Sequence, residues 1–463
     1  MPRSAAAAVA GAGAAAVVGA TTWLVLAAAE RPGTLSPPSL RAHATHPWVL
    51  GPLHGLMPGL SASPRRLHAD VVVVLVVIGV GWVAAWVAAP ALGARALLGA
   101  TAAAHVVLFL GPPLALTDVF NYGLYGRMAA LHGLNPYRAF PAQAAADPLY
   151  PLANWHHLRS PYGPLFTLGT EALTPLGTHG WLWAWKAIVV LSSLATVLLA
   201  AALAQRLGAS RPRAIAALGL SPLLLVSEVG GFHQDVPALA CVVAAAWCLV
   251  RGRDADAPRW ADPAAGALVV AAAGIKPSFG IVVGLVVLGA TRRPRAIAGA
   301  AVAGAVVGIV VLIAYGGALP DLSTQGRLVT PLSVPNLLGL AAGHQGADQS
   351  VRSAAQVVLV AVALIATAAV AVRRRWALSA IGLVLFCAVL GLAWVMPWYL
   401  VWALPFIAVG RPRFLAPLAV VATCWLAVGS LPQLPGILHS AGYFPTRTST
   451  GLQNHREFVR LVR

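Results

Sequence analysis

The sequence is divided into thirteen long runs of apolar residues that contain almost no charge. A helix needs about 20 apolar residues to cross a bilayer, and 59% hydrophobic against 10% charged residues is more apolar material than a soluble core uses. We therefore predict an all-α polytopic membrane protein of about 13 transmembrane helices, forming one domain over 1–463. The runs lie near 5–29, 70–90, 95–116, 181–204, 214–230, 235–250, 262–275, 278–290, 296–315, 351–372, 377–394, 398–410 and 414–431.

Two of these runs, 262–275 and 398–410, are short enough to be re-entrant. The first run resembles a signal peptide in position, but it is long for the apolar region of one. We expect it to stay as an anchor.

The positive charges predict the orientation of the chain. Sixteen arginines fall in the very short loops that share a side with the amino terminus, whereas the basic residues of the other side are spread over far more sequence. Positive residues concentrate on the cytoplasmic side. We therefore expect an integral plasma-membrane protein with external segments near 30–69, 117–180, 316–350 and 432–463.

The net charge of +18 does not indicate a nucleic-acid partner. No basic face with interleaved aromatic residues is present, and the charges form short clusters between apolar runs. Membrane lipids are the partner that this distribution predicts.

Three of the thirteen carboxylates, Asp118, Glu228 and Asp235, lie next to the ends of apolar runs. A carboxylate at a membrane boundary is costly unless it is paired or hydrated, which makes each a functional candidate. Asp118 opens the stretch TDVFNYGLYGR, which carries Tyr122 and Arg127 at the start of the largest external segment. The alternative is that Thr117 or Asp118 only caps a helix.

Two further polar groups lie at expected outer turns. Two glycines break the run SPLLLVSEVGGFHQDVPALA before His233 and Asp235, a pair that fits a metal site, a polar turn near an active site, or a structural turn; two ligands are too few to specify a metal. Lys276 in GIKPSFG suits a phosphate, or it extends to the membrane interface as many lysines do.

Two irregular stretches complete the candidate set. WHHLRSPYGPLF carries Arg159 and Tyr162 where Pro and Gly interrupt the backbone. WVMPWYLVWALPF carries Trp398 and Tyr399 between two prolines, which suggests a broken helix that lines a cavity rather than an aromatic belt alone.

Together these motifs resemble the GT-C class of polytopic glycosyltransferases. More narrowly, the chain is similar to the actinobacterial polyprenol-phosphomannose-dependent α-1,6-mannosyltransferases of the lipomannan core. The resemblance extends from about 117 to 405 and rests on TDVFNYGLYGR, NPY at 135–137, SPYGPLF, the SPLLL…GGFHQD block, IKP at 275–277 and PWYLVWALP, in that order.

The chain departs from this family at two positions. Gln234 stands where the family has Asn, and Val119 follows Asp118 where many members of the class have a second acidic residue. The second departure counts against a metal site built on such a pair. We assign no metal ligand and leave a divalent cation open as a cofactor.

The resemblance implies an inverting transfer of mannose from a polyprenyl-phosphate mannose to a mannoside or lipoglycan acceptor on the extracytoplasmic face, forming an α-linkage, expected to be 1,6. Asp118 is the candidate base. A phosphate leaves as a stable anion, so one carboxylate suffices if cations assist its departure. The residues expected to bind the donor phosphate or substrate are Tyr122, Arg127, Tyr137, Arg159, Tyr162, His233, Asp235, Lys276, Trp398 and Tyr399.

Two alternative functions stay open on the sequence. One is a related transferase that uses a different prenyl-phosphate sugar, such as an arabinofuranosyl or glucosyl donor. The other is a transporter or flippase of lipid-linked sugars, although such proteins more often have pseudo-symmetric halves.

Overall fold

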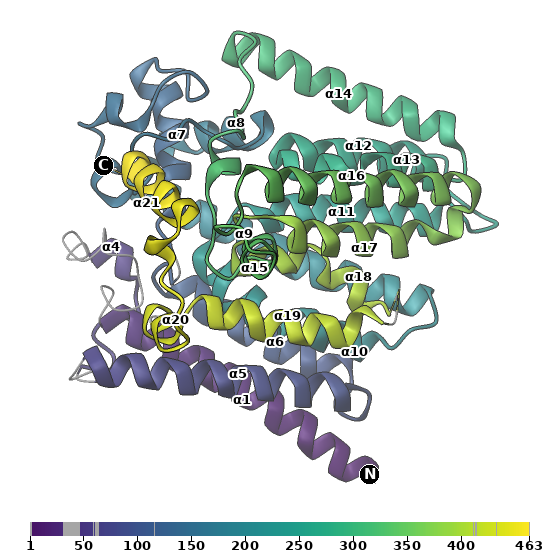
Figure 1. The fold of residues 1–463 in the computed structure, drawn as a ribbon. Helices are drawn as coiled ribbons and strands as arrows, with labels where there is room; N and C mark the ends of the chain where they lie inside the picture. The colour runs from purple at the N-terminus through teal and green to yellow at the C-terminus, as the bar shows by residue number, and fades with distance from the viewer. Residues whose placement is uncertain are drawn as a thin grey trace.

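The computed structural model describes residues 2–30, 47–58, 60, 64–114, 116–410, 412, 414–431 and 433–462. Over these residues the chain forms helices and connecting loops and no strand. The prediction of an all-α polytopic protein is confirmed, and the longer helices run roughly alongside one another (Figure 1).

All thirteen predicted runs fall on helical segments. The helices that correspond to them are α1 (Arg3–Glu30), α5 (Pro64–Leu92), α6 (Ala94–Leu110), α9 (Gly177–Arg206), α10 (Arg211–Gly219), α11 (Asp235–Arg251), α12 (Ala261–Ile275), α13 (Val283–Gly289), α14 (Arg293–Tyr315), α16 (Gln349–Val372), α17 (Ala377–Gly391), α18 (Leu404–Ala408) and α19 (Leu415–Gly429).

The number of membrane crossings is a separate matter from the number of helical segments. Within the described ranges, six helical stretches are long and apolar enough to span a bilayer, and eight are if each of two bent pairs counts as one span. Helices such as α6 and α12 are apolar but shorter. The count of 13 therefore stays a prediction.

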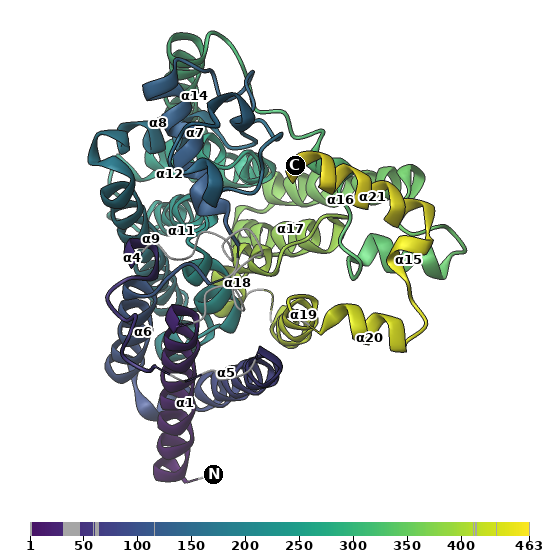
Figure 2. The ribbon, with the colours of Figure 1, turned by 90° about the vertical axis from the view of Figure 1, so that its left-hand side faces the viewer.

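The remaining helices connect the spans at one end of the bundle. These are α4 (Pro47–Leu50), α7 (Asp118–His132), α8 (Pro164–Ala172), α15 (Val334–Ala341), α20 (Leu434–Ser440) and α21 (Ser449–Val462). In Figure 2 the C-terminal segment passes from α19 through α20 to α21, which lies near α15.

Small residues allow the helices to approach closely. A Cβ on Gly81 of α5 would lie 2.8 Å from the carbonyl oxygen of Gly13 in α1. On α12 and α14, Gly266 and Gly299 face the partner backbone in the same way. Apolar side chains gain little by leaving lipid for another helix, so close backbone packing of small residues stabilises such contacts.

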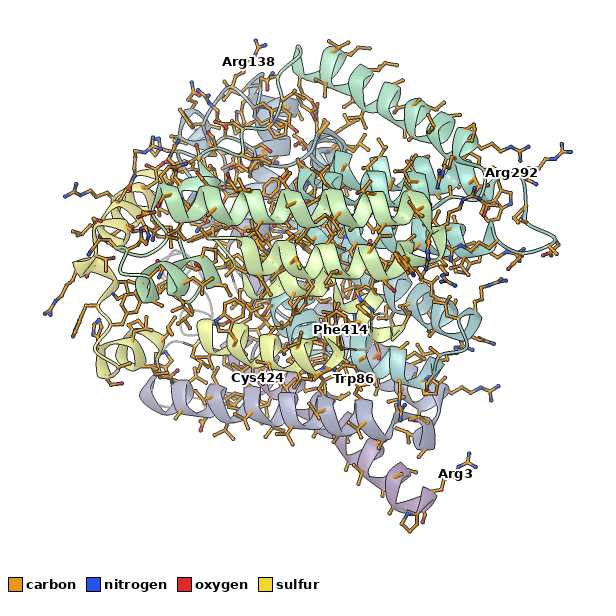
Figure 3. The ribbon with its side chains drawn as sticks, turned by 45° about the vertical axis from the view of Figure 1, so that its right-hand side comes forward. Arg3, Trp86, Arg138, Arg292, Phe414 and Cys424 are labelled. Atoms are coloured by element: carbon orange, nitrogen blue, oxygen red, sulfur yellow. The ribbon has the colours of Figure 1, made fainter. Side chains whose placement is uncertain are left out.

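The two ends of the bundle differ in chemistry. The segments expected outside, including α7, α15 and α21, gather at the end that holds the C-terminus, and the N-terminus lies at the other (Figure 1). Arg3 and Arg292 lie towards that second end, away from Arg138 (Figure 3). There Asp254 accepts hydrogen bonds from Arg206 at 2.7 Å and Arg251 at 2.5 Å, which joins two of the arginine-rich loops.

Candidate active site

Asp118 is the first residue of α7 and is buried beneath Trp155. The indole Nε1 of Trp155 donates a hydrogen bond of 2.7 Å to Oδ1 of Asp118. Nδ1 of His233 lies 3.7 Å from the second carboxylate oxygen. Thr117 makes no capping hydrogen bond through its side chain, and the Asp118 carboxylate faces other elements. The helix-cap alternative therefore does not describe this residue.

Asn121 holds Trp155 in place over Asp118. Its side-chain oxygen accepts the backbone N–H of Trp155 at 3.2 Å, and its amide nitrogen donates to the carbonyl of Trp155 at 3.3 Å. Asn121 is itself fully buried. This amide therefore fixes the loop that carries Trp155 to the first turn of α7.

Burial raises the pKa of Asp118 to about 6. The hydrogen bond from Trp155 and the positive charge of Lys276 act in the opposite direction, and the charge of Asp235 adds a smaller upward contribution. A carboxyl with a pKa near 6 is still mostly ionised at neutral pH. It is a stronger base than an ordinary aspartate, which suits it to accept a proton.

His233 lies behind Asp118 and is completely buried. Its ring stacks on Trp398 with centroids 3.6 Å apart, and its Nδ1 is 3.2 Å from the hydroxyl of Tyr122. The turn before it needs unusual backbone: Phe232 has φ of 53°, and a Cβ on Gly231 would lie 2.5 Å from the imidazole. The absence of a side chain at Gly231 therefore leaves the space that the imidazole of His233 occupies.

Asp235 and Lys276 form a buried ion pair across two helix ends. Nζ of Lys276 lies 2.5 Å from Oδ1 of Asp235, which also accepts the indole N–H of Trp402 at 2.6 Å. The ammonium sits 4.6 Å from the ring centre of Tyr399. Lys276 is therefore held by a carboxylate and aromatic faces and does not extend to the interface as a surface lysine would.

Gly163 of the SPYGPLF motif places the neighbouring loop against Lys276. Its N–H donates to the carbonyl of Ile275 at 3.0 Å, and any Cβ would collide with the backbone of Gly274 and Ile275. Only glycine allows this approach, which explains why an irregular backbone with Tyr162 lies beside the Lys276 turn.

Glu228 holds the backbone next to Asp235 in place through a hydrogen bond. It belongs to the π-helical segment Leu223–Val229 and is fully buried. Its Oε1 accepts the N–H of Val236 at 2.9 Å, at the start of α11. Glu228 thereby satisfies one of the free N–H groups of that helix and fixes the residue next to Asp235.

These groups surround a small polar cavity of about 70 Å³. Eight of the eleven predicted site residues belong to this cluster, seven by lining the cavity and His233 by its contacts with Asp118 and Tyr122. The seven are Asp118, Tyr122, Tyr162, Asp235, Lys276, Trp398 and Tyr399.

The other three predicted residues lie outside the cavity. Arg127 donates to both oxygens of the buried Asp147, at 3.0 and 2.9 Å. The guanidinium of Arg159 lies over Phe140, 4.8 Å from the ring centre. The hydroxyl of Tyr137 donates to the carbonyl of Tyr162 at 3.0 Å. Arg127 thus anchors its loop, and Tyr137 supports a residue that lines the cavity.

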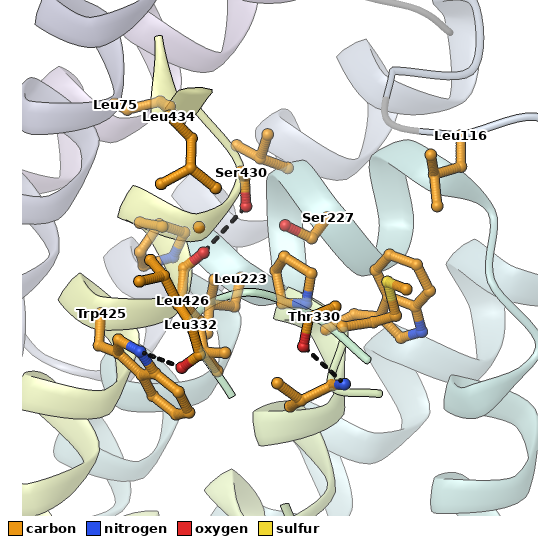
Figure 4. Close-up of a pocket in the computed structure, with 18 of the residues that line it drawn as sticks. Leu75, Leu116, Leu223, Ser227, Thr330, Leu332, Trp425, Leu426, Ser430 and Leu434 are labelled. Atoms are coloured by element: carbon orange, nitrogen blue, oxygen red, sulfur yellow. Dashed lines mark hydrogen bonds between the residues drawn. The ribbon is translucent and has the colours of Figure 1, made fainter. Parts of the chain in front are cut away.

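A larger apolar cavity of about 330 Å³ opens beside the polar one. Its walls include Leu75, Leu223, Leu332 and Trp425, with few polar groups such as Ser227 and Thr330 (Figure 4). Leu116, Met396 and Trp398 line both cavities. A site built in this way has an apolar half and a charged half that meet at three shared side chains.

The structure adds residues that the sequence did not single out. Trp155 is the first residue of the WHHLRSPYGPLF stretch that carries Arg159 and Tyr162, while Leu322 and Gln325 line the cavity from the segment 316–350. Asn121 could have been noticed as a lone amide within the aromatic stretch of α7. Leu322 and Gln325 have no local signal, because an exposed loop of ordinary polarity surrounds them in the sequence.

The described residues offer few ligands for a metal ion. Among them, no group of three or more His, Cys, Asp and Glu side chains is arranged to hold one. Of the acidic and histidine side chains, Asp118 and Asp235 line the cavity, and one oxygen of each already accepts a hydrogen bond from an indole. The cluster as it stands does not fit a cation site.

The fold and the site define a multi-pass membrane protein in which a buried carboxylate lines a polar cavity that adjoins an apolar one. Residues 17–292 match the family described as alpha-(1->6)-mannopyranosyltransferase, N-terminal domain. That match covers more than half of the chain, and the chain belongs to this family. No solved structure matches it.

Several relatives share recognisable sequence with the chain. A probable alpha-(1->6)-mannopyranosyltransferase of Mycolicibacterium smegmatis is 26% identical over 65% of this chain and 62% of its own length. An alpha-(1->6)-mannopyranosyltransferase of Mycobacterium tuberculosis is 25% identical over 64% and 62%. Alpha-(1->6)-mannopyranosyltransferase B of Corynebacterium glutamicum is 26% identical over 79% and 69%. The chain thus spans about 62% of the length of the first two relatives.

Proposed function

We propose that this protein transfers mannose from a polyprenyl-phosphate mannose to a mannoside of a lipoglycan acceptor, on the extracytoplasmic face of the plasma membrane. The transfer inverts the anomeric carbon and forms an α-1,6 linkage. Membership of the family and the names of the relatives support the sugar and the linkage.

The junction of the two cavities carries the proposal for the donor. A prenyl phosphate has a long apolar tail and an anionic head, and the apolar cavity meets the polar one at Leu116, Met396 and Trp398. The tail fits the apolar side. The phosphate then lies on the side of Lys276, the one Lys or Arg among the described residues that line the polar cavity.

The proposed reaction needs one base and one cation. Asp118 takes the proton of the acceptor hydroxyl as that oxygen bonds to the anomeric carbon. The bond between the anomeric carbon and the phosphate oxygen breaks, and the phosphate keeps the electron pair. Lys276 stabilises the charge that develops on the phosphate. The leaving anion is stable, so no second carboxylic acid is required.

The test is the rate of mannose transfer from labelled polyprenyl-phosphate mannose to a short α-1,6-linked mannoside. We expect Asp118→Asn to lower the rate by about 10²- to 10⁴-fold, the usual contribution of general base catalysis. Asp321→Asn, which changes an exposed carboxylate at the same end of the molecule, is the matched control. Equal rates in wild type and Asp118→Asn would exclude Asp118 as the base.

The same assay separates the alternative functions. Transfer from another prenyl-phosphate sugar, with none from the mannose donor, would replace the proposed substrate. Movement of the labelled lipid across vesicles without any transfer would favour a flippase. Transfer by protein purified in detergent, where movement across a membrane has no meaning, would exclude transport as the sole activity.

A further inference from the structure

Besides the polar and apolar cavities, the surface has a groove between α21 and the loop that follows α14. Its volume is about 250 Å³, equal to roughly eight water molecules at about 30 Å³ each. That volume suits one unit of the size of a sugar ring rather than a single ion. Its walls include Asn336, Tyr443, Thr446, Asn454, His455 and Phe458.

Several polar atoms in this groove are not used by the fold. Asn454 accepts the N–H of Val329 at 2.8 Å, which holds α21 to the loop, but its amide nitrogen makes no hydrogen bond with a described residue. The ring of His455 makes none either within the part of the chain that the structure describes. The hydroxyl of Tyr443 accepts from Asn336 at 2.9 Å, so its own proton can be donated to a ligand.

The described lining of the groove presents amide, hydroxyl, imidazole and aromatic side chains. It contains no carboxylate, ammonium or guanidinium group. Among the nearby charges, Glu457 binds Arg327 at 3.0 Å and Arg460 at 2.8 Å, and the guanidinium of Arg447 lies over the ring of Phe444. Amide, imidazole and hydroxyl groups beside an aromatic ring suit a neutral ligand with many hydroxyls and apolar C–H faces.

The groove lies next to the catalytic cluster. The ring of Phe458, in the wall of the groove, packs edge-on against Trp155 with centroids 5.5 Å apart. Trp155 lines the polar cavity and donates to Asp118. The N–H of His157 also donates to the carbonyl of Leu461 at 2.9 Å. One pair of aromatic rings therefore separates the groove from the base.

We infer that this groove binds an inner sugar unit of the acceptor chain, while the terminal hydroxyl of that chain reaches Asp118. The inference rests on the proposed function, because it gives the acceptor of that same reaction. A chain of neutral hexoses leaving the cavity passes Phe458 and meets Asn454, His455 and Tyr443. The enzyme then binds acceptors of several units more tightly than acceptors of one or two.

The experiment compares KM for an α-1,6-linked mannose disaccharide and pentasaccharide at fixed donor concentration. Wild type should have a clearly lower KM for the pentasaccharide. We expect His455→Ala to reduce the ratio of the two KM values by about fivefold to tenfold, the effect of about one lost hydrogen bond. Gln453→Ala, on the exposed side of α21 and outside the groove, should keep the wild-type ratio.

A ratio in His455→Ala equal to that of wild type would overturn the inference and leave the proposed function intact. Direct binding of the pentasaccharide, measured by saturation-transfer NMR on the purified full chain, separates the remaining outcomes. If no mannose is transferred to any acceptor but binding is weakened in His455→Ala, the proposed function fails and the groove stands as a saccharide site. If the pentasaccharide does not bind, or binds equally well to wild type and His455→Ala, the inference that the groove is a saccharide site is overturned.

Discussion

At the scale of single residues, the proposed chemistry depends on the groups that surround Asp118. The carboxyl is buried under Trp155, whose indole N–H stabilises the ionised form, while burial favours the neutral form. Burial is the larger effect, so the pKa is raised to about 6. A base must be ionised to act. Activity should therefore fall as the pH drops through about 6.

The first prediction concerns the two opposing effects on the pKa of Asp118, which burial raises and the hydrogen bond from Trp155 lowers. Trp155→Phe removes the one hydrogen bond that lowers the pKa of Asp118 while keeping an aromatic ring against Phe458. The pKa should rise further, and the acidic limb of kcat/KM should move to higher pH. A pH profile of mannose transfer from pH 5 to 9 measures this shift.

A matched variant separates this effect from a general loss of stability. Trp82→Phe also removes a buried indole hydrogen bond, the one of 3.0 Å to the carbonyl of Ala217, but Trp82 lines neither the polar nor the apolar cavity. It should lower stability by about 1 kcal/mol and leave the position of the acidic limb unchanged. If the acidic limb of the kcat/KM profile lies at the same pH in wild type and Trp155→Phe, the assignment of Asp118 as the titrating base is contradicted.

At the scale of elements, the turn between α10 and α11 positions two site residues at once. The π-helical segment Leu223–Val229 places the Glu228 side chain at the first turn of α11, where it accepts from Val236. The carbonyl of Glu228 also accepts the N–H of His233 at 3.1 Å. One residue thus fixes the backbone beside both His233 and Asp235. Single-turn π-helical insertions of this kind are frequent at functional sites.

The second prediction tests whether Glu228 stabilises this turn through its hydrogen bond with Val236. Glu228→Ala leaves the N–H of Val236 without its acceptor, and we expect a loss of roughly 1–3 kcal/mol together with reduced transfer. Glu228→Gln retains an acceptor oxygen and should restore most of both. Thermal unfolding in detergent and the transfer rate give the two measurements. Equal loss in the two variants would mean that the carboxylate acts by its charge rather than by this hydrogen bond.

At the scale of the whole molecule, the helices separate two ends of different character. The helices α7 and α21, which carry Asp118 and one wall of the groove, lie at the end of the bundle that holds the C-terminus (Figure 1). The arginine-rich loops, with Arg292 among them, lie at the other (Figure 3). If the arginine-rich end faces the cytoplasm, as the distribution of positive charge predicts, then Asp118 and the C-terminal helix face outwards.

The third prediction is that orientation. In a variant without its four cysteines, Gln453→Cys on α21 should react with a membrane-impermeant maleimide in intact cells. Arg295→Cys, at the other end, should react only after the cells are permeabilised. Both positions are exposed, so reactivity depends on the side of the membrane. The reverse pattern would place the catalytic cluster in the cytoplasm and remove the proposed function.

The sequence by itself predicted many of the residues that line the polar cavity. Asp118 and Asp235 are candidates because a carboxylate beside an apolar run is costly wherever the chain folds, and that cost is a local property. Lys276 is a candidate because a lone ammonium in an outer turn suits a phosphate. Arg127 and Arg159 are candidates as cations expected on the same side of the membrane as Asp118, and they lie outside the cavity. Arg127 has a partner in Asp147, twenty residues further along the chain, and local sequence does not indicate whether a charge will find such a partner.

The helical, membrane-spanning class follows from the sequence alone, because hydropathy over a window of residues is a sum of local contributions. Pairings between distant parts of the chain are decided only by the tertiary structure. Asp118 accepts a hydrogen bond from Trp155, which is 37 residues away in the sequence, and Asp235 accepts one from Trp402, which is 167 residues away. The C-terminal helix reaches Trp155 through Phe458 and so adds a groove to the site. Such contacts depend on how whole helices pack, which no single stretch of sequence contains.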